Sequence, residues 1–236
     1  MVLNARQITK IYNVVPPVHA LMDVSIDIRA GERVVVLGKS GSGKSTFLNI
    51  VGLLDKATSG SLHFLGQDVS RLSKRAMDRL RADSLGFVFQ ENHVLGHRTV
   101  AENLHIKLAV SSIPKGQWSV KVAKVLEQVG LSHREHAYAR LLSGGEKQRL
   151  AVARAIITSP KILLADEPTG NLDDDNANAV LDLFDKQAKL GSAVVIITHD
   201  PRLIGRMDRA FYLEAGVIRE LTDGEYLGGA IAKRLR

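Results

Sequence analysis

The sequence predicts an α/β protein built on a mostly parallel sheet. Short apolar runs alternate with helical patterns along the chain, as expected of strands that are joined by crossover helices. The runs at 34–37, 162–165 and 193–198 are almost entirely apolar, which is typical of strands covered on both faces. A glycine-rich turn between the first of these runs and a helical pattern predicts a strand–loop–helix unit.

Shorter segments complete the predicted order. Three further strands are expected at 24–28, where apolar and polar residues alternate, and at 62–65 and 87–89. Helical patterns cover about 100 to 129 with a break at 114–116, 147 to 158, and a segment through 180–184 that ends near Gly191. The runs 211–213 and 217–218 predict a hairpin. The helical stretch at 91–142 has the character of an insertion into the alternating scheme.

Composition limits the class of protein. The chain has 236 residues, of which 45% are apolar and 24% charged, as in soluble globular proteins. Its net charge of +7 leaves nucleic acid and anionic lipid headgroups open as partners. The densest basic clusters, 71–81 and 233–236, are equally explained as solvated faces. The absence of cysteine excludes disulfides, cysteine-ligated zinc and iron–sulfur clusters. No secretory leader or membrane-spanning run is expected.

The glycine-rich turn fits a phosphate-binding loop, G-x-x-x-x-G-K-[S/T]. Its glycines allow backbone N–H groups to converge on phosphate oxygens, and the following helix N-terminus adds positive potential. Lys44 is expected to reach the terminal phosphates, and the Ser45 hydroxyl to bind Mg²⁺. The loop residues are Gly38, Lys39, Ser40, Gly41, Ser42, Gly43, Lys44, Ser45 and Thr46.

Two carboxylates follow the apolar run at 162–165. Asp166 and Glu167 come at the carboxyl end of this predicted strand, where open α/β sheets bind their ligands. Asp166 is placed to hold Mg²⁺ or its waters, and Glu167 to polarise an attacking water. An acidic turn at a strand end is the alternative, but the phosphate loop in the same chain favours catalysis.

Two more polar residues end predicted strands. His199 follows 193–198 and Gln90 follows 87–89. A histidine after a strand is commonly a turn residue, but here it ends a buried strand as Asp166 does. The side chains of His199 and Asp166 are therefore expected to face one crevice. The Gln90 amide can contact the metal or the water there.

A second set of backbone donors is predicted at Ser143, Gly144 and Gly145, which open the helix at 147–158. An exposed helix N-terminus with glycines is suited to a phosphate. Since the first loop holds the nucleotide from one side, this set is placed to close over the other. An ordinary serine N-cap is the alternative.

Together these motifs resemble those of the ATP-binding cassette (ABC) ATPases. Gly38–Thr46 is similar to Walker A, Gln90 to the Q-loop, Leu142–Glu146 to the LSGGE signature, Ile162–Glu167 to Walker B, Asn171–Asp173 to the D-loop with Asp173, and His199 to the switch histidine. Tyr12 stands where the family has an aromatic residue that stacks on adenine. Leu164–Asp173 and Gly52–Asp55 resemble the MacB/LolD/FtsE branch.

The resemblance implies a fold and a division of the chain. A P-loop NTPase core with a mostly parallel sheet is expected, with an antiparallel β subdomain and an inserted α-helical subdomain. Residues 1–236 are one ABC ATPase domain on this basis. Residues 1–90 and 150–236 form the ATP-binding core, and 91–149 form the helical signature subdomain.

The resemblance also implies how the protein works. Two chains bind two ATP molecules with Mg²⁺ in a head-to-tail homodimer, and a transmembrane permease is the partner, contacted near Phe89–Asn103. The protein is then a cytoplasmic ATPase on the inner face of the membrane that drives export or mechanotransmission, without nucleic acid. A soluble ABC ATPase of a scaffold-assembly or cell-division complex is the alternative.

Overall fold

The centre of the fold is a six-stranded, mostly parallel sheet, seen in a computed structural model that describes residues 1–222. Its strand order is β10-β9-β3-β8-β7-β6, and only the β9–β10 hairpin is antiparallel. The strands are β3 (Arg33–Leu37), β6 (Leu85–Val88), β7 (Ile162–Asp166), β8 (Ala193–Thr198), β9 (Arg209–Glu214) and β10 (Val217–Glu220). The predicted α/β class is confirmed.

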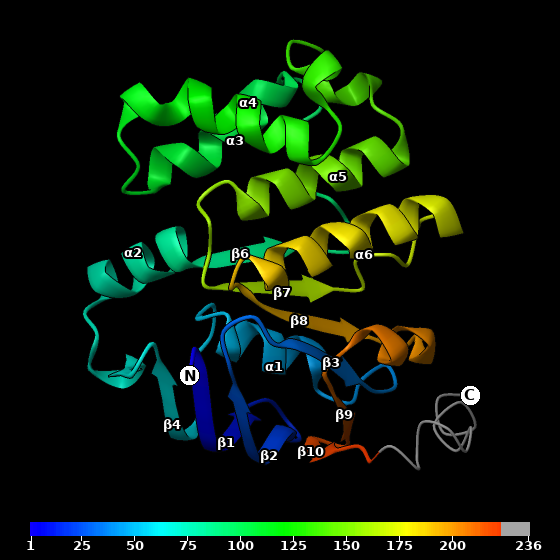
Figure 1. Cartoon of the computed structure of the whole chain (residues 1–236). Coiled ribbons are helices and arrows are strands. Elements are labelled where there is room, and N and C mark those ends of the chain that lie inside the picture. Colours follow the sequence, from blue (N-terminus) through cyan, green and yellow to red (C-terminus); the bar gives the residue numbers. More distant parts are fainter. Residues whose placement is uncertain (223–236) are drawn as a thin grey trace.

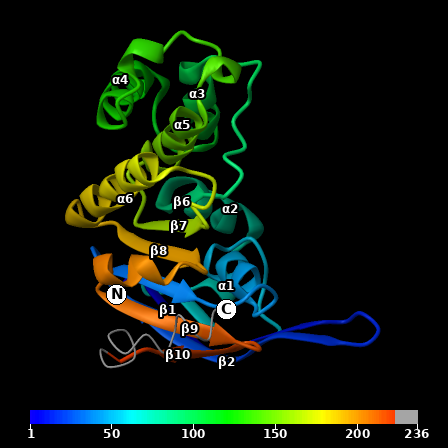
Figure 2. The same cartoon turned by 90° about the vertical axis from the view of Figure 1, so that its right-hand side faces the viewer.

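A second, antiparallel sheet lies beside it (Figure 1). Its order is β2-β1-β4-β5, from β1 (Leu3–Tyr12), β2 (Val18–Ile28), β4 (Ser59–Phe64) and β5 (Gln67–Asp68). Helix α1 (Lys44–Val51) joins the two sheets, because its Phe47 and Leu48 lie in one hydrophobic cluster with residues of both. The β1–β2 hairpin extends away from the body of the protein (Figure 2), and its tip residue Val15 is 101% exposed.

The other face of the central sheet is covered by helices. Buried apolar residues of β7 and β8 form a second cluster with the helices that follow β6. Figure 1 shows α3 and α4 stacked beyond α5, with α6 next to the sheet. The helices are α2 (Lys74–Ser84), α3 (Val100–Val110), α4 (Trp118–Gln128), α5 (Gly144–Ile156) and α6 (Asp174–Lys189). Short 3₁₀ segments are η1 (Val69–Arg71), η2 (Lys115–Gln117), η3 (Ser132–Arg134), η4 (Ala139–Leu141) and η5 (Pro201–Arg206).

The observed boundaries differ modestly from the predicted ones. Helix α5 starts at Gly144, three residues before the predicted start at 147, so the predicted subdomain boundary at 149/150 falls inside a helix. The division into subdomains stays a prediction. Leu65 leaves β4 because its φ of 49° begins a turn.

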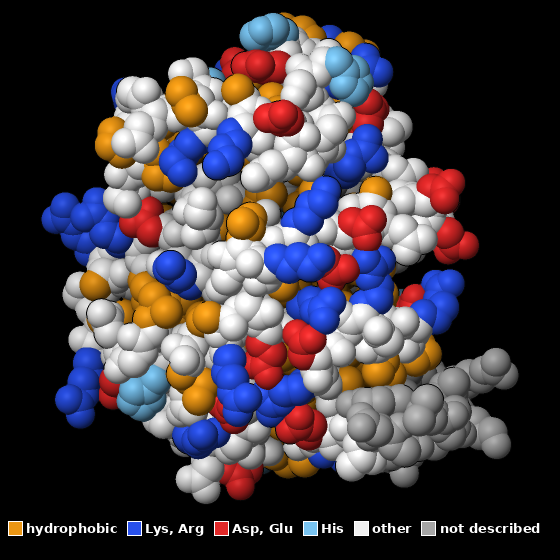
Figure 3. All heavy atoms as spheres, viewed as in Figure 1, with side chains coloured by type: hydrophobic (Ala, Val, Ile, Leu, Met, Phe, Trp, Pro, Cys, Tyr) orange, Lys and Arg blue, Asp and Glu red, His pale blue; other side chains and the backbone are white. Residues whose placement is uncertain are grey.

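The basic clusters can be placed in part. Residues 71–81 fall mainly on α2, none of whose residues is buried, which agrees with a solvated helix face. The cluster at 233–236 lies outside the described residues. Figure 3 shows lysine and arginine side chains interspersed with acidic ones over the face seen in Figure 1. Within residues 1–222, none of the helices combines the length and the apolar character that a bilayer span requires.

Candidate functional site

The glycine-rich loop between β3 and α1 passes so close to other backbone segments that two glycines are sterically required. A Cβ on Gly38 would lie 2.4 Å from the carbonyl oxygen of Leu213. A Cβ on Gly43 would lie 2.3 Å from that of Ala20, and Gly43 has a φ of +104°. Larger residues at either position would displace the backbone, so these glycines fix the loop against β9 and β2.

The N-terminus of α1 points its first amide groups out of the helix. Gly43 is the N-cap, and the first N–H groups after it have no intrahelical acceptor by geometry. The Lys44 ammonium donates to the carbonyl oxygens of Gly38 and Lys39, at 2.7 and 2.8 Å. Burial lowers the pKa of Lys44, while Glu167 and Asp166 act in the opposite direction. Positive charge and bare amides therefore meet at one point, as anion binding requires.

The two predicted carboxylates lie at the end of β7, next to β8. Asp166 pairs with Ile197 in the parallel ladder, and the Glu167 N–H donates to the Ile197 carbonyl at 2.8 Å. Burial, and then the neighbouring Glu167, raise the pKa of Asp166. A cation beside Asp166 would favour its charged form. Ser45, Gln90 and Asp166 supply the oxygen ligands that Mg²⁺ prefers, so these residues fit that ion.

The Glu167 carboxylate is held by β8 and the residue after it. The Thr198 hydroxyl donates to Oε2 at 2.8 Å, the His199 N–H donates to Oε1 at 2.9 Å, and His199 Nδ1 lies 2.6 Å from Oε1. Glu167 itself has a φ of 45°. The sequence prediction missed Thr198, although a hydroxyl residue directly before a predicted catalytic histidine at a strand end was a usable signal.

A single cavity of about 1040 Å³ brings most of the predicted residues together. Those that line it are Tyr12, Lys39, Ser40, Gly41, Gly43, Lys44, Ser45, Thr46, Gln90, Asp166, Glu167 and His199. Val18, His19 and Ala20 of β2, with Ala215 and Gly216 of the β9–β10 turn, complete its wall and were not predicted. Gly38 and Ser42 do not line the cavity. The Ser42 hydroxyl is buried and has no hydrogen-bond partner among the described residues.

The predicted second phosphate site lies outside this cavity. Ser143 is the N-cap of α5 in a capping box, since its hydroxyl accepts from the Glu146 N–H at 3.2 Å and the Glu146 carboxylate accepts from the Ser143 N–H at 2.8 Å. Asp173 caps α6 by accepting from the Asn176 N–H at 2.8 Å. Gly145 faces Asn176, because a Cβ there would lie 2.1 Å from the amide oxygen. The two helix starts are thus adjacent to each other.

Helix α5 also holds the segment after Gln90. The Gln148 amide donates to the Pro168 carbonyl at 2.8 Å and to the Phe89 carbonyl at 3.4 Å. The Arg154 guanidinium donates to the carbonyls of His93 and Asn92, at 2.8 and 2.9 Å. These contacts connect α5 to the backbone beside Gln90 and beside Glu167, and neither side chain was predicted to take part.

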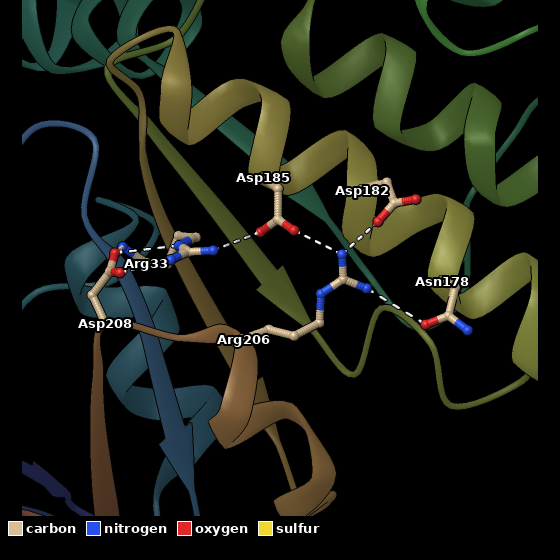
Figure 4. Close-up of polar contacts among 6 residues, drawn as sticks. All are labelled: Arg33, Asn178, Asp182, Asp185, Arg206 and Asp208. Carbon is tan, nitrogen blue, oxygen red and sulfur yellow. Dashed lines mark hydrogen bonds and ion pairs between the residues drawn. The ribbon is translucent and has the colours of Figure 1, made fainter.

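Charged residues anchor the segment that follows His199. In Figure 4, Arg206 of η5 lies between Asp182 and Asp185 of α6 and also contacts Asn178. Asp185 also accepts from Arg33 at 3.1 Å, and Arg33 contacts Asp208 at 2.7 Å. The cluster ties η5 and the start of β9 to α6 and β3.

Comparison with known proteins identifies the family. A family model described as ABC transporter matches residues 21–170. The chain is 39% identical over 201 residues to the macrolide export ATP-binding/permease protein MacB of Escherichia coli K12. That alignment covers 85% of this chain but 31% of the relative, so the chain spans less than a third of the curated relatives that it matches.

Solved structures of ABC cassettes superpose on this chain, in agreement with the family match. The ATP-binding cassette MJ0796, in a dimeric post-hydrolysis state bound to ADP and Pi, superposes with a TM-score of 0.84 at 32% identity and covers 93% of this chain and 98% of its own. The cbiO1 protein of Clostridium perfringens, part of the ABC transporter complex cbiONQ, superposes with a TM-score of 0.85 at 26% identity. This superposition covers 99% of the present chain and 93% of cbiO1. The predicted P-loop cassette fold is confirmed. The chain therefore belongs to the ABC transporter family and, as one of its ATP-binding cassettes, is an ATPase.

Proposed function

We propose that the chain binds ATP with Mg²⁺ in the cavity at the end of the central sheet and hydrolyses it there to drive a membrane complex. The observation that carries the proposal is that one cavity gathers Lys44, Asp166, Glu167 and His199. Those residue types in one crevice supply charge neutralisation, a metal ligand and a base.

The protein's own side chains take distinct roles in this proposal. Lys44 and the amides at the start of α1 neutralise the phosphates. Glu167 orients the attacking water and accepts its proton, while Thr198 and His199 keep the carboxylate in place. Ser45, Asp166 and Gln90 hold Mg²⁺, which supplies further neutralisation of phosphate charge. Because phosphoryl transfer depends mainly on positioning and electrostatics, each contact contributes.

The proposed active form is a head-to-tail homodimer. Ser143, Gly144, Gly145 and Asp173 do not line their own chain's cavity. Backbone donors at the start of α5 suit a phosphate, so we assign them to ATP held by a second copy. The dimeric state of the related MJ0796 cassette supports this arrangement.

The proposed partner is a transmembrane permease, which holds the chain at the inner face of the membrane. Support comes from the relatives, since MacB is named an ATP-binding/permease protein of macrolide export. A cavity of about 370 Å³ is lined in part by Gln90–Val94, which belong to the segment expected to meet that partner. Export or mechanotransmission is the proposed task, and no substrate is assigned. Co-purification with a membrane protein supports it, whereas recovery alone in the soluble fraction favours a scaffold-assembly ATPase.

The test is a comparison of Glu167→Gln and Ser143→Arg with the unmodified chain. Glu167→Gln removes the base, so turnover falls by about 100-fold or more, while ATP affinity is kept and Mg-ATP produces dimers in light scattering. Ser143→Arg blocks closure, so it binds ATP as a monomer without turning it over.

The matched control is Glu127→Gln, an exposed glutamate of α4, which leaves both readouts unchanged. Unchanged turnover in Glu167→Gln refutes the base assignment. Normal turnover in Ser143→Arg refutes the shared site.

A further inference from the structure

Tyr12 lines the cavity, and its hydroxyl is anchored to a residue that does not line it. Tyr12 is the last residue of β1, and its hydroxyl donates to Asp55 Oδ2 at 3.2 Å. Asp55 lies 43 residues away in the sequence, just after α1. The contact therefore connects the antiparallel sheet to the segment that follows the phosphate-loop helix.

Asp55 is itself held at several points. Lys10 Nζ lies 2.9 Å from Oδ1 and 2.8 Å from Oδ2, and the Lys56 N–H donates to Oδ1 at 2.7 Å. Lys10 also donates to the Lys56 carbonyl at 2.8 Å. The hydrogen bond from Lys10 is the main cause that lowers the pKa of Asp55. The carboxylate is thus a fixed acceptor rather than a mobile surface group.

Lys10 acts on the ring as well. Its ammonium lies over the Tyr12 ring, 4.8 Å from the ring centroid, within the range of a cation–π contact. The Lys10 side chain is only 13% exposed, so it is confined to this position. Lys10 occupies one face of the ring, and Tyr12 is at the same time a lining residue of the cavity.

We propose that Asp55 and Lys10 are positioning residues that hold the Tyr12 ring as the platform for the base of the nucleotide. The inference rests on the proposed ATP site and adds to it a determinant of ligand choice. A ring held in advance loses little conformational freedom when a base stacks on it. The phosphate loop binds the triphosphate in any ligand, whereas this triad selects ligands that carry a base.

The test compares the affinity of the full chain for Mg-ATP with its affinity for Mg-tripolyphosphate, which has no base. Both are measured by competition with a fluorescent nucleotide. Tyr12→Ala is expected to weaken ATP binding about 5- to 100-fold, the range for loss of one base–aromatic stack. Asp55→Ala and Tyr12→Phe each weaken it about three- to tenfold, because each removes the same hydrogen bond. Tripolyphosphate affinity stays unchanged in all three.

A double-mutant cycle decides whether Asp55 acts through the hydroxyl. Combining Asp55→Ala with Tyr12→Phe should weaken ATP binding less than the two single effects multiplied, because both remove one contact. Asp78→Ala is the matched control: Asp78 is also a half-exposed acid in an ion pair, with Arg81 at 2.6 Å, and should change neither affinity.

Each contrary outcome overturns something specific. If Asp55→Ala weakens ATP and tripolyphosphate equally, Asp55 supports the phosphate loop and the inference is wrong. Strictly multiplicative effects in the cycle also refute it. If Tyr12→Ala leaves ATP affinity unchanged, the base site itself is misplaced in the proposed function. If Tyr12→Ala weakens ATP binding but Asp55→Ala and Tyr12→Phe do not, the base site stands and the positioning role falls.

Discussion

Three contacts from two consecutive residues fix the carboxylate of Glu167, the proposed base. Both carboxylate oxygens are used, one by the Thr198 hydroxyl and the other by the His199 backbone and ring. Thr198 is 1% exposed and its hydroxyl also accepts from the Asp200 N–H at 3.0 Å. The orientation of Glu167 therefore depends on a buried side chain that has one available position.

We expect Thr198→Val to lower turnover by about tenfold or more, because a hydrogen bond to a charged group is lost at the reacting centre. ATP affinity should not change, since Thr198 does not line the cavity. Steady-state kinetics and nucleotide titration check both points. Thr198→Ser keeps the hydroxyl and should restore most of the turnover. An equal loss of turnover in both variants would assign Thr198 to packing alone.

For single residues of the site, the sequence predicted those that belong to the catalytic motifs and missed those that support them. Lys44, Asp166, Glu167 and His199 converge as expected because parallel strands end at one edge of the sheet. Thr198 and Asp55 were missed because their partners, Glu167 and Tyr12, are 31 and 43 residues away. The position of Thr198 before His199 was a usable local signal, but its pairing with Glu167, like that of Asp55 with Tyr12, depends on the tertiary fold.

Among the helices, α5 has two connections to the segment after Gln90. Its Arg154 is mostly buried, and burial lowers the pKa of the guanidinium. The cost of that burial is offset by two carbonyl acceptors, those of Asn92 and His93. A planar guanidinium can donate to both carbonyls at once, which an ammonium on a flexible stem does less well.

Arg154→Lys is expected to lower the free energy of unfolding by about 1–2 kcal/mol, because at least one of the two hydrogen bonds from the guanidinium is lost. Turnover should fall at the same time, since Gln90 directly precedes the released segment. Urea unfolding measures the free energy of unfolding, and an ATPase assay measures the turnover. Arg79→Lys on exposed α2 is the control and should match the unmodified chain. An unchanged free energy of unfolding in Arg154→Lys would show that the two-carbonyl contact of the guanidinium does not stabilise the fold.

The elements that sequence patterns missed have a common cause. Strand β1 contains several polar residues, its register against β2 shifts repeatedly between Ala5 and Ile11, and Gln7 has a φ of 51°. These irregularities break the period-2 alternation by which strands are recognised. Helix α2 has no fully buried residue, and only Met77 and Leu80 pack on the core, so its apolar signal is weak. Strands β3, β7 and β8 were found because they are buried on both faces.

Within residues 1–222, two large hydrophobic clusters lie on opposite faces of the central sheet, and a third, smaller cluster includes Val35 and Tyr212. Ion pairs join β3 to α6 and to the segment before β9. Arg33 at the start of β3 contacts Asp185 of α6 and Asp208 at the start of β9 (Figure 4). Its hydrogen bond is the main cause that lowers the pKa of Asp208. A depressed carboxyl pKa stabilises the fold above its unfolded pKa, about 3.9, and the contribution disappears as the pH falls through the folded pKa.

Arg33→Met should therefore cost about 1 kcal/mol at pH 7, a small value because Asp208 is 41% exposed and solvent screens the pair. The difference from the unmodified chain should narrow as the pH falls below about 4, because Asp208 is protonated first in the unfolded chain and then, at its lower pKa, in the folded one. Urea unfolding at pH 7 and below about pH 4 measures the free energy of unfolding of both chains. Arg71→Met removes an 86% exposed partner of Asp68 and should have no effect. If the difference in the free energy of unfolding is the same at both pH values, the destabilisation comes from lost packing of the Arg33 methylene groups.

The projecting β1–β2 hairpin has a practical use. Val15 at its tip makes little contact with the protein, and it stands three residues from Tyr12, which lines the cavity. Because the chain contains no cysteine, V15C provides a single thiol for a fluorescent dye. A probe there sits in the hairpin loop that follows the strand carrying the proposed base platform, and it can follow ligand exchange in real time.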